Sequence, residues 1–419
     1  MRSPAPAQAR RAVAAAVAGN VLEWYDFAIY AYMATIIAKK FFPAGDEASS
    51  LLSTFAAFGI GFVARPLGGI VLGRLGDVRG RKSALLITIA LMAAGTMLIG
   101  LTPTYDSIGV AAPTMILCAR LLQGFSAGGE WGGSTAFIVE WAPEGRRGLY
   151  GSLQQCSVAI GLLLGATIAA LVGMALPPDA MDNWGWRVPF LLGGVIGPVG
   201  LYMRRHVSET PAFSATQQVS PVRSEWPPLL AARAFGFTVV WTVSYYTVLA
   251  YMPTFLQKHA GVARSQALWY AAAGLLLLAV ASPVTGRLSD RIGRKPLLLA
   301  ACAGCALLPY PLFTAIVSHA QSGVILLSQL ALAFVIALFS GPGPAAIAEI
   351  FPTGQRSTWM STGYSLAVAI FGGFAPFVAT WLIDRTGNPV APAFCLIAAA
   401  LLSMLVIAPM RETALAPLR

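Results

Sequence analysis

Charged side chains are scarce in this chain of 419 residues. Asp, Glu, Lys and Arg make up 11% of it, whereas hydrophobic residues make up 57%. Soluble domains carry about 25% charged residues, so this composition excludes an ordinary soluble protein and indicates a protein that lies in lipid. Twelve spans of about 20–25 residues would use roughly 250–300 residues. The short loops that remain leave no room for a signalling domain, which argues against a membrane sensor.

Histidine and cysteine are also few. The three histidines lie at the ends of apolar runs, and the five cysteines lie inside such runs. Cys302 and Cys305 form a C-x-x-C pair with Ala and Gly neighbours and no His nearby, a pattern that favours helix packing over metal or redox chemistry. No nucleophile–base pair, phosphate loop or set of metal ligands is present. The sequence therefore predicts no metal site, no catalytic residue and no enzyme.

A ten-residue charged segment occurs twice. Residues 73–82 read GRLGDVRGRK and residues 286–295 read GRLSDRIGRK, with seven positions identical. Each copy lies between two long apolar runs. A second pattern, E-x-x-P-x-G-x-R, begins at Glu140 and again at Glu349. Two motifs that repeat in the same order with nearly the same offset predict a duplicated membrane unit.

The apolar runs predict twelve spans. They lie at 12–38, 51–73, 83–101, 111–140, 149–176, 187–203, 232–257, 264–286, 296–318, 322–349, 357–383 and 391–410. The polar, Pro-rich segment 204–231 separates six spans from six. We therefore predict an N-terminal bundle (1–203), a cytoplasmic linker (204–231) and a C-terminal bundle (232–419).

The positive charges predict the orientation. With the N-terminus inside, cytoplasmic loops and tails carry 20 of the 28 Lys and Arg residues. This asymmetry satisfies the positive-inside rule for twelve spans with both termini in the cytoplasm. The net charge of +11 is thus explained by topology and does not indicate a nucleic-acid partner.

The repeated loop resembles the hallmark loop of the major facilitator superfamily. The chain resembles that superfamily over its whole length. Three further segments resemble its metabolite:proton symporter family: GNVLEWYDF at 19–27, FVARPLG at 62–68 and RLLQGFSAGGE at 120–130. Within that family, the stretch 120–128 and AIFGG at 369–373 are most similar to citrate and tricarboxylate symporters. The chain stops at Arg419 without the coiled-coil tail of the osmosensory branch, which weakens an osmolyte interpretation.

The resemblance implies an all-α integral membrane protein of the bacterial inner membrane, with twelve transmembrane helices in two pseudo-symmetric six-helix bundles. It implies proton-coupled import of a small organic acid, with citrate, other di- or tricarboxylates, shikimate, proline and betaine among the family's substrates. We expect a di- or tricarboxylate, with a zwitterion such as proline or betaine as the alternative, and a drug:proton antiporter as a weaker one. Small organic anions, protons and the lipid bilayer are the expected partners. No cofactor beyond the proton gradient is expected, and the protein is expected to be a monomer.

Five ionisable residues lie inside spans of the first half, and such groups are functional candidates because burying them in lipid is costly. Glu23 and Asp26 share one face of the first span with Tyr30. Two adjacent carboxyl groups in a low dielectric cannot both ionise cheaply, as a proton carrier requires. We predict Asp26 as the main proton site and Glu23 as its modulator. The alternative is that an arginine neutralises either acid permanently.

Arg120 offers a fixed fork of donors to a carboxylate, and Gln123 lies one turn further along the same span. The anionic partner of Arg120 would be Asp26 or the substrate. Arg65 would bind a second substrate carboxylate or would pair with an acid on a neighbouring span. Glu130, among four glycines, would be an inner proton relay or a structural acid.

Other polar groups are weaker candidates. Gln154, Tyr245 and Tyr246 would close a polar cavity from later spans, although aromatic residues in spans more often pack in the core. Asp77 and Asp290 stand beside Arg81 and Arg294 in the two loop motifs. Each aspartate would pair with its arginine or cap a neighbouring helix and so hold a cytoplasmic gate. The alternative is that these loop charges only set the topology.

Overall fold

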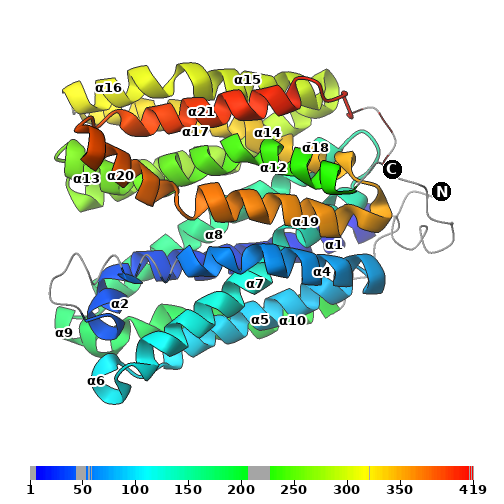
Figure 1. The fold of residues 1–419 in the computed structure, drawn as a ribbon. Helices are drawn as coiled ribbons and strands as arrows, with labels where there is room; N and C mark the ends of the chain where they lie inside the picture. The colour runs from blue at the N-terminus through cyan, green and yellow to red at the C-terminus, as the bar shows by residue number, and fades with distance from the viewer. Residues whose placement is uncertain are drawn as a thin grey trace. The chain divides into compact units, whose positions relative to one another are not determined.

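A computed structural model describes residues 6–43, 53–54, 57, 59–205, 227–319, 321–414, 416 and 418. Within these ranges every regular element is a helix (Figure 1). The all-α class is therefore confirmed. The predicted linker lies mostly outside the described residues.

The helices of the first half of the sequence are α1 (Pro6–Tyr32), α2 (Ala34–Phe41), α4 (Arg65–Arg79), α5 (Arg81–Leu101), α6 (Tyr105–Ile108), α7 (Ala111–Glu140), α8 (Arg147–Ala175), α9 (Pro178–Ala180) and α10 (Arg187–Arg205). Those of the second half are α12 (Pro227–Tyr245), α13 (Met252–His259), α14 (Arg264–Ile292), α15 (Arg294–Leu307), α16 (Pro309–His319), α17 (Ser322–Ser340), α18 (Gly343–Ile350), α19 (Arg356–Ala367), α20 (Ala375–Thr386) and α21 (Ala391–Ile407). Short π-helical turns join α12 to α13 and lie between α19 and α20. Eleven of the twelve predicted spans fall on one of these helices or on a consecutive pair, and the described end of the span predicted at 51–73 lies on α4.

Six helical stretches in the described part are long and apolar enough to cross a membrane by length and composition alone. A seventh is added if α15 and α16, bent by 41° at Leu308, form one span. Two of the remaining predicted spans miss this length or hydropathy for local reasons. Helix α7 carries Arg120, Glu130 and Glu140, and α21 has only 17 residues. The charges that mark candidate sites thus lower the hydropathy of the helices that carry them.

Proline and glycine set the helix breaks. The helix before Arg65 is interrupted at Ala64 and resumes with Pro66 in its first turn, as the R-P sequence predicts. The G-P-G-P segment at 341–344 ends α17 at Ser340 and restarts the chain as α18 at Gly343. In the two loop motifs, Gly80 and Gly293 have φ of 99° and 102°, a region that other residues adopt only with strain. The duplicated glycine therefore has one backbone role in both copies.

Two compact units make up the chain. Unit 1 comprises residues 1–141, 160–221 and 353–365, and unit 2 comprises 142–159, 222–352 and 366–419. Relative to the predicted halves, each unit includes one short segment of the other half. The start of α8 belongs to unit 2, and most of α19 belongs to unit 1. Each unit is therefore built from both halves of the sequence.

In unit 1, α5 packs against α7 and α10, and α4 packs against α7, with α1 against α10 and α7. Helices α4 and α7 touch at Gly128, where a Cβ would lie 2.0 Å from the carbonyl oxygen of Arg65. This agrees with the prediction that the glycines of this stretch permit close helix contact. In unit 2, α14 packs on α17, and α21 packs on α12 and α15.

Candidate functional site

The carboxylates of α1 point into the interior of unit 1. Glu23 and Asp26 are both buried. A Cβ added at Gly193 of α10 would lie 2.5 Å from Oδ1 of Asp26, so glycine leaves room for this aspartate against α10. The helix periodicity placed the two acids on one face, and the packing of α10 explains how that face is closed.

Arg120 is linked to Asp26 through two intervening side chains. Its Nη1 donates to Oε1 of Gln123 at 2.8 Å, and Nε2 of Gln123 donates to Oγ1 of Thr96 at 2.8 Å. Thr96 also hydrogen-bonds the side chain of Asp26, and Arg120 interacts with Asp26 electrostatically. The two groups that the sequence proposed as partners are therefore coupled, with Gln123 and Thr96 between them.

Aromatic rings surround both arginines of unit 1. The guanidinium carbon of Arg120 lies 4.5 Å from the ring centroid of Tyr30 and 5.0 Å from that of Phe27. Arg65 lies 4.9 Å from the same Phe27 ring and 4.6 Å from Phe62. One ring of α1 thus contacts two buried cations, an arrangement that cation–π attraction favours.

Arg65 differs from Arg81 and Arg294, which both form ion pairs. It is 1% exposed, and within the described residues its Nε and Nη2 atoms have no hydrogen-bond partner and it forms no ion pair. A buried guanidinium with unpaired donors is costly. The structural ion pair that was the alternative for Arg65 is therefore not found in the described part of the chain.

A small cavity lies between α1, α5, α7 and α10. It is lined by Gly19, Leu22, Glu23, Asp26, Thr88, Ile89, Met92, Ala93, Ser126, Glu130, Gly193 and Gly197. Glu130 accepts a short hydrogen bond from the hydroxyl of Thr88. Three carboxyl groups from two helices, all predicted as proton-coupling groups, therefore line one cavity inside unit 1.

The remaining substrate candidates lie in unit 2. Nε2 of Gln155 donates to Oε1 of Gln154 at 2.7 Å. The rings of Tyr245 and Tyr246 meet at 6.2 Å between centroids, and Tyr246 lies beside Gly372. All three candidates are buried. The structure thus groups Arg65, Arg120, Gln123 and Tyr30 within unit 1, and the candidates of unit 2 are described separately.

The first loop motif forms an ion cluster in unit 1. Asp77 lies 2.5 Å from Nη1 of Arg81 and accepts hydrogen bonds from the backbone N–H groups of Ser357 and Thr358, at the start of α19. Glu140 lies 3.3 Å from Arg81 and 2.7 Å from Arg356. Asp77 therefore both pairs with its arginine and caps a helix, which are the two contacts that the motif predicted.

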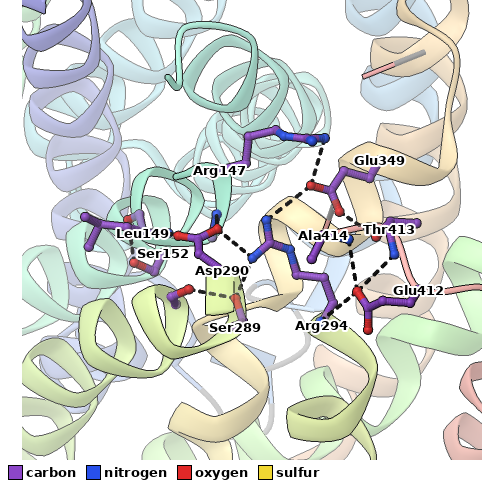
Figure 2. Close-up of polar contacts among 12 residues, drawn as sticks. Arg147, Leu149, Ser152, Ser289, Asp290, Arg294, Glu349, Glu412, Thr413 and Ala414 are labelled. Carbon is purple, nitrogen blue, oxygen red and sulfur yellow. Dashed lines mark hydrogen bonds and ion pairs between the residues drawn. The ribbon is translucent and has the colours of Figure 1, made fainter. Parts of the chain in front are cut away.

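The second motif forms the matching cluster in unit 2 (Figure 2). Asp290 lies 2.8 Å from Arg294 and accepts from the N–H groups of Gly148 and Leu149, at the start of α8. Glu349 lies 3.3 Å from Arg294 and 3.0 Å from Arg147. The duplicated sequence thus gives duplicated contacts.

The second cluster has an addition at the C-terminal tail (Figure 2). Glu412 accepts from the backbone N–H groups of Arg294 and Lys295 at 2.9 and 3.0 Å, and the hydroxyl of Thr413 donates to Glu349 at 2.5 Å. Partial burial tends to raise the pKa of Glu412, but hydrogen bonds from four backbone N–H groups together hold the pKa below its usual range. The N-terminus of α15 is therefore capped by the tail.

Sequence reasoning missed part of these clusters. The E-x-x-P-x-G-x-R repeat was found, but its charges were not assigned a role; each glutamate pairs with the arginine of the other copy, Glu140 with Arg356 and Glu349 with Arg147. The repeat itself was the available signal. Thr88, Thr96 and Gly193 carried no signal, because single small residues in apolar runs are common. Within the described ranges, no three His, Cys, Asp or Glu side chains gather as metal ligands.

Comparisons with known proteins agree with this architecture. The chain is 38% identical over 404 residues to the citrate-proton symporter of Klebsiella pneumoniae, covering 94% of this chain and 90% of that protein. It is 33% identical over 430 residues to the proline/betaine transporter of Escherichia coli K12, covering 98% and 85%. The fold of the proton:xylose symporter XylE, bound to 6-bromo-6-deoxy-D-glucose, matches with a TM-score of 0.83 at 18% identity over 97% of each chain.

These relatives are transporters, which confirms the expectation that the chain is not an enzyme. The profile of the Major Facilitator Superfamily matches residues 16–318 and 244–417, and so covers almost the whole chain. This protein belongs to the Major Facilitator Superfamily of membrane transporters.

Proposed function

We propose that the protein is a proton-coupled symporter that imports a small organic acid, most specifically a di- or tricarboxylate such as citrate. The observation that carries the proposal is a pair of buried arginines, one on α4 and one on α7, that contact the same ring of α1. Arg65 and Arg120 both lie within 5.0 Å of the Phe27 ring centroid, and two nitrogen atoms of Arg65 have no hydrogen-bond partner among the described residues. Two guanidinium groups that contact the same ring suit a substrate with two or more carboxylates.

The coupling mechanism follows from the contacts of Arg120. In the absence of substrate, burial disfavours the charged form of Asp26, and the positive charge of Arg120 opposes this effect by favouring the carboxylate. A substrate carboxylate that binds Arg120 neutralises this charge and removes that support. Asp26 then takes up one proton, so a proton and the anion enter the buried site together. Release of the anion restores the field of Arg120, and Asp26 returns its proton.

The gate would be formed by the two ion clusters. Asp77 caps α19, which follows the second E-x-x-P-x-G-x-R motif, and Asp290 caps α8, which follows the first. Each cap therefore ties a helix of one sequence half to a loop of the other. We propose that these contacts break and re-form as the transporter alternates. They would lie on the cytoplasmic side of a bacterial inner membrane, with both termini in the cytoplasm.

A zwitterion is the second candidate substrate. The proline/betaine transporter of E. coli covers 98% of this chain, and the glycine betaine/proline/ectoine/pipecolic acid transporter of Dickeya dadantii is 34% identical over 430 residues. Aromatic cages recognise quaternary ammonium groups. In unit 1, however, the rings of Phe27 and Tyr30 contact arginines, which favours an anion at this position.

Uptake into proteoliposomes with an imposed pH gradient tests the proposal. Radiolabelled citrate, succinate, shikimate, proline and betaine are compared, and proton movement is followed with an internal pH dye. We expect accumulation of a di- or tricarboxylate that collapses when a protonophore is added. Strong uptake of betaine or proline, without uptake of any of the acids, would show that the substrate is a zwitterion and not an anion. Uptake that does not depend on the pH gradient would exclude proton coupling.

A further inference from the structure

We propose that the cavity between α1, α5, α7 and α10 binds one ordered water molecule, which transfers protons between the carboxyl groups of α1 and Glu130. The inference rests on the proposed proton coupling and adds the route that the proton takes. It makes Thr88 and Met92 positioning residues of that route. It also assigns the proton path to residues other than the two arginines of unit 1 that would bind the anion.

The size and lining of the cavity suit a single water molecule. Its volume is about 20 Å³, and a water molecule needs a site of at least about 10–15 Å³ and two to four polar partners. Three carboxyl groups and the hydroxyl-bearing residues Thr88 and Ser126 line the walls. These polar groups stand among apolar side chains, and they distinguish the cavity from the wholly apolar ones that stay dry.

A buried acceptor in the cavity wall lacks a partner. Asp26 is buried, with 4% of its surface exposed. Its Oδ1 has no hydrogen-bond partner among the described residues. Leaving a buried polar atom unpaired costs about 1–3 kcal/mol, and more when the group is charged. A water molecule in the adjoining cavity supplies the donor that Oδ1 lacks.

One face of α5 holds the two ends of the route. Thr88, Met92 and Thr96 are spaced four residues apart, so they lie along the same face. Thr88 donates to Glu130, and Thr96 hydrogen-bonds Asp26. The two threonines are about 12 Å apart along the helix axis. Met92 lies between them and lines the cavity, and so controls how much room the water has.

The ionisable side chains that line the cavity are all acidic. Helix α1 contributes Glu23 and Asp26, and α7 contributes Glu130, whereas α5 and α10 line the cavity with uncharged residues only. The positive charge of Arg120 acts on Asp26 at one end. Three carboxyl groups therefore face one small space, with a positive charge near one of them.

The transfer conserves charge at every step. The carboxyl group of Asp26 or Glu23 gives its proton to the water oxygen and becomes a carboxylate. In the same step the water gives one of its own protons to the carboxylate of Glu130, which becomes neutral. The water is regenerated, and a single negative charge moves from α1 to α7. Thr88 holds the Glu130 carboxylate in the position that receives the proton.

Two substitutions test the water and its acceptor. Met92→Phe fills the cavity, and Met92→Leu is its matched control because Leu and Met have nearly the same volume. Thr88→Val removes the hydroxyl that donates to Glu130, and Ser134→Ala, one turn beyond Glu130, removes a hydroxyl that donates only to its own helix. Each variant is compared in pH-driven uptake and in counterflow, with radiolabelled citrate as the probe. Counterflow needs no net proton movement and also reports that the variant is folded.

We expect Met92→Phe and Thr88→Val to lose about tenfold or more of the pH-driven uptake, as removal of a proton-transfer group does. Their counterflow should stay near the wild-type value, and both controls should behave as wild type in both assays. Wild-type pH-driven uptake in Met92→Phe and Thr88→Val would overturn the relay while leaving the proposed symport intact. An equal loss of counterflow would show that both residues have only a structural role. This result would also overturn the relay.

An infrared measurement separates the relay from the identity of the substrate. The pH-induced difference spectrum of the wild type in proteoliposomes should contain a protonated-carboxyl band that disappears in Glu130→Gln. Thr88→Val should shift the frequency of this band, because the lost hydroxyl hydrogen-bonds the same carboxyl group. A band that Glu130→Gln does not change would overturn the relay even if citrate is transported. If citrate is not transported, the spectrum still tests the relay while the proposed substrate fails.

Discussion

At the scale of single residues, Arg65 and Asp26 are the groups whose surroundings give the clearest expectations. Both are buried, and each has at least one polar atom that lacks a hydrogen-bond partner in the described part of the chain. Natural proteins retain such costly groups mainly at functional sites. Their chemical roles differ, so they can be tested separately.

Asp26→Asn removes the proton-carrying group and keeps the shape of the side chain. We expect pH-driven uptake to fall by about 100-fold, in the range of lost general acid–base groups, with counterflow preserved. Asp106→Asn, in the exposed helix α6, serves as the control. Uptake in Asp26→Asn that still depends on pH as in the wild type would exclude Asp26 as the carrier.

Arg65→Gln removes a positive charge that forms no ion pair among the described residues. A hydrogen bond to a charged group contributes about 1.5–3 kcal/mol, so we expect the KM for a multivalent anion to rise about 10- to 100-fold. A monocarboxylate should be affected less, and the thermal stability should change little. Arg187→Gln is the control, because Arg187 donates to the carbonyl oxygens of Gly100 and Thr102 and should affect stability alone. An unchanged KM would leave Arg65 outside the substrate site.

At the scale of helices, the caps of the two clusters can be compared with each other. Asp77→Asn weakens the cap of α19, and Asp290→Asn weakens that of α8. Losing a cap costs about 0.5–2 kcal/mol. We expect Asp77→Asn to lower the melting temperature more, because the tail residues Glu412 and Thr413 also support the second cluster. Tryptophan fluorescence during heating in detergent measures the difference, and an equal loss would mean that the tail adds nothing.

The cap of α15 predicts a pH dependence. The folded-state pKa of Glu412 lies below its usual range, so its carboxylate stabilises the fold above the ordinary glutamate pKa and loses this effect as the pH falls through the folded value. Glu412→Gln should therefore melt at a lower temperature than the wild type at pH 7. The difference should shrink at acidic pH, where the wild-type carboxyl group is also neutral. A difference in melting temperature that is constant with pH would contradict this assignment. Glu144→Gln, at an exposed position, is the control and should melt at the same temperature as the wild type.

At the scale of the whole molecule, the exchange of segments between the sequence halves is the main feature. Glu140 is buried and pairs with Arg81 and with Arg356, more than 200 positions further along the chain. Removing one partner of a buried ion pair costs about 3–5 kcal/mol, because the remaining charge is left unpaired. Glu140→Gln should therefore destabilise the protein strongly. The double variant Glu140→Gln/Arg356→Gln should recover part of the loss, and a loss that is simply additive would contradict the pairing.

Much of the fold was predictable because lipid imposes a strong rule on the sequence. Backbone polar groups must be satisfied within each span, so apolar runs of about 20 residues become helices. Wherever the structure describes them, the predicted spans lie mainly on helices. The candidate site was predictable to the extent that buried charge is rare in such runs. Glu23, Asp26, Arg65, Arg120 and Glu130 stood out for that reason, and all five are buried in unit 1.

The sequence by itself determined the superfamily, the duplication and the identities of the charged groups, because these follow from hydropathy, spacing and repeated motifs. Only the tertiary structure decided which groups meet. The link from Arg120 to Asp26 depends on Gln123 and Thr96, the shared cavity depends on the packing of α10 against α1, and the arginine of each repeated motif pairs with the glutamate of the other copy. These contacts join residues far apart in the chain, and periodicity along one helix specifies which face is buried but not which helix packs against it.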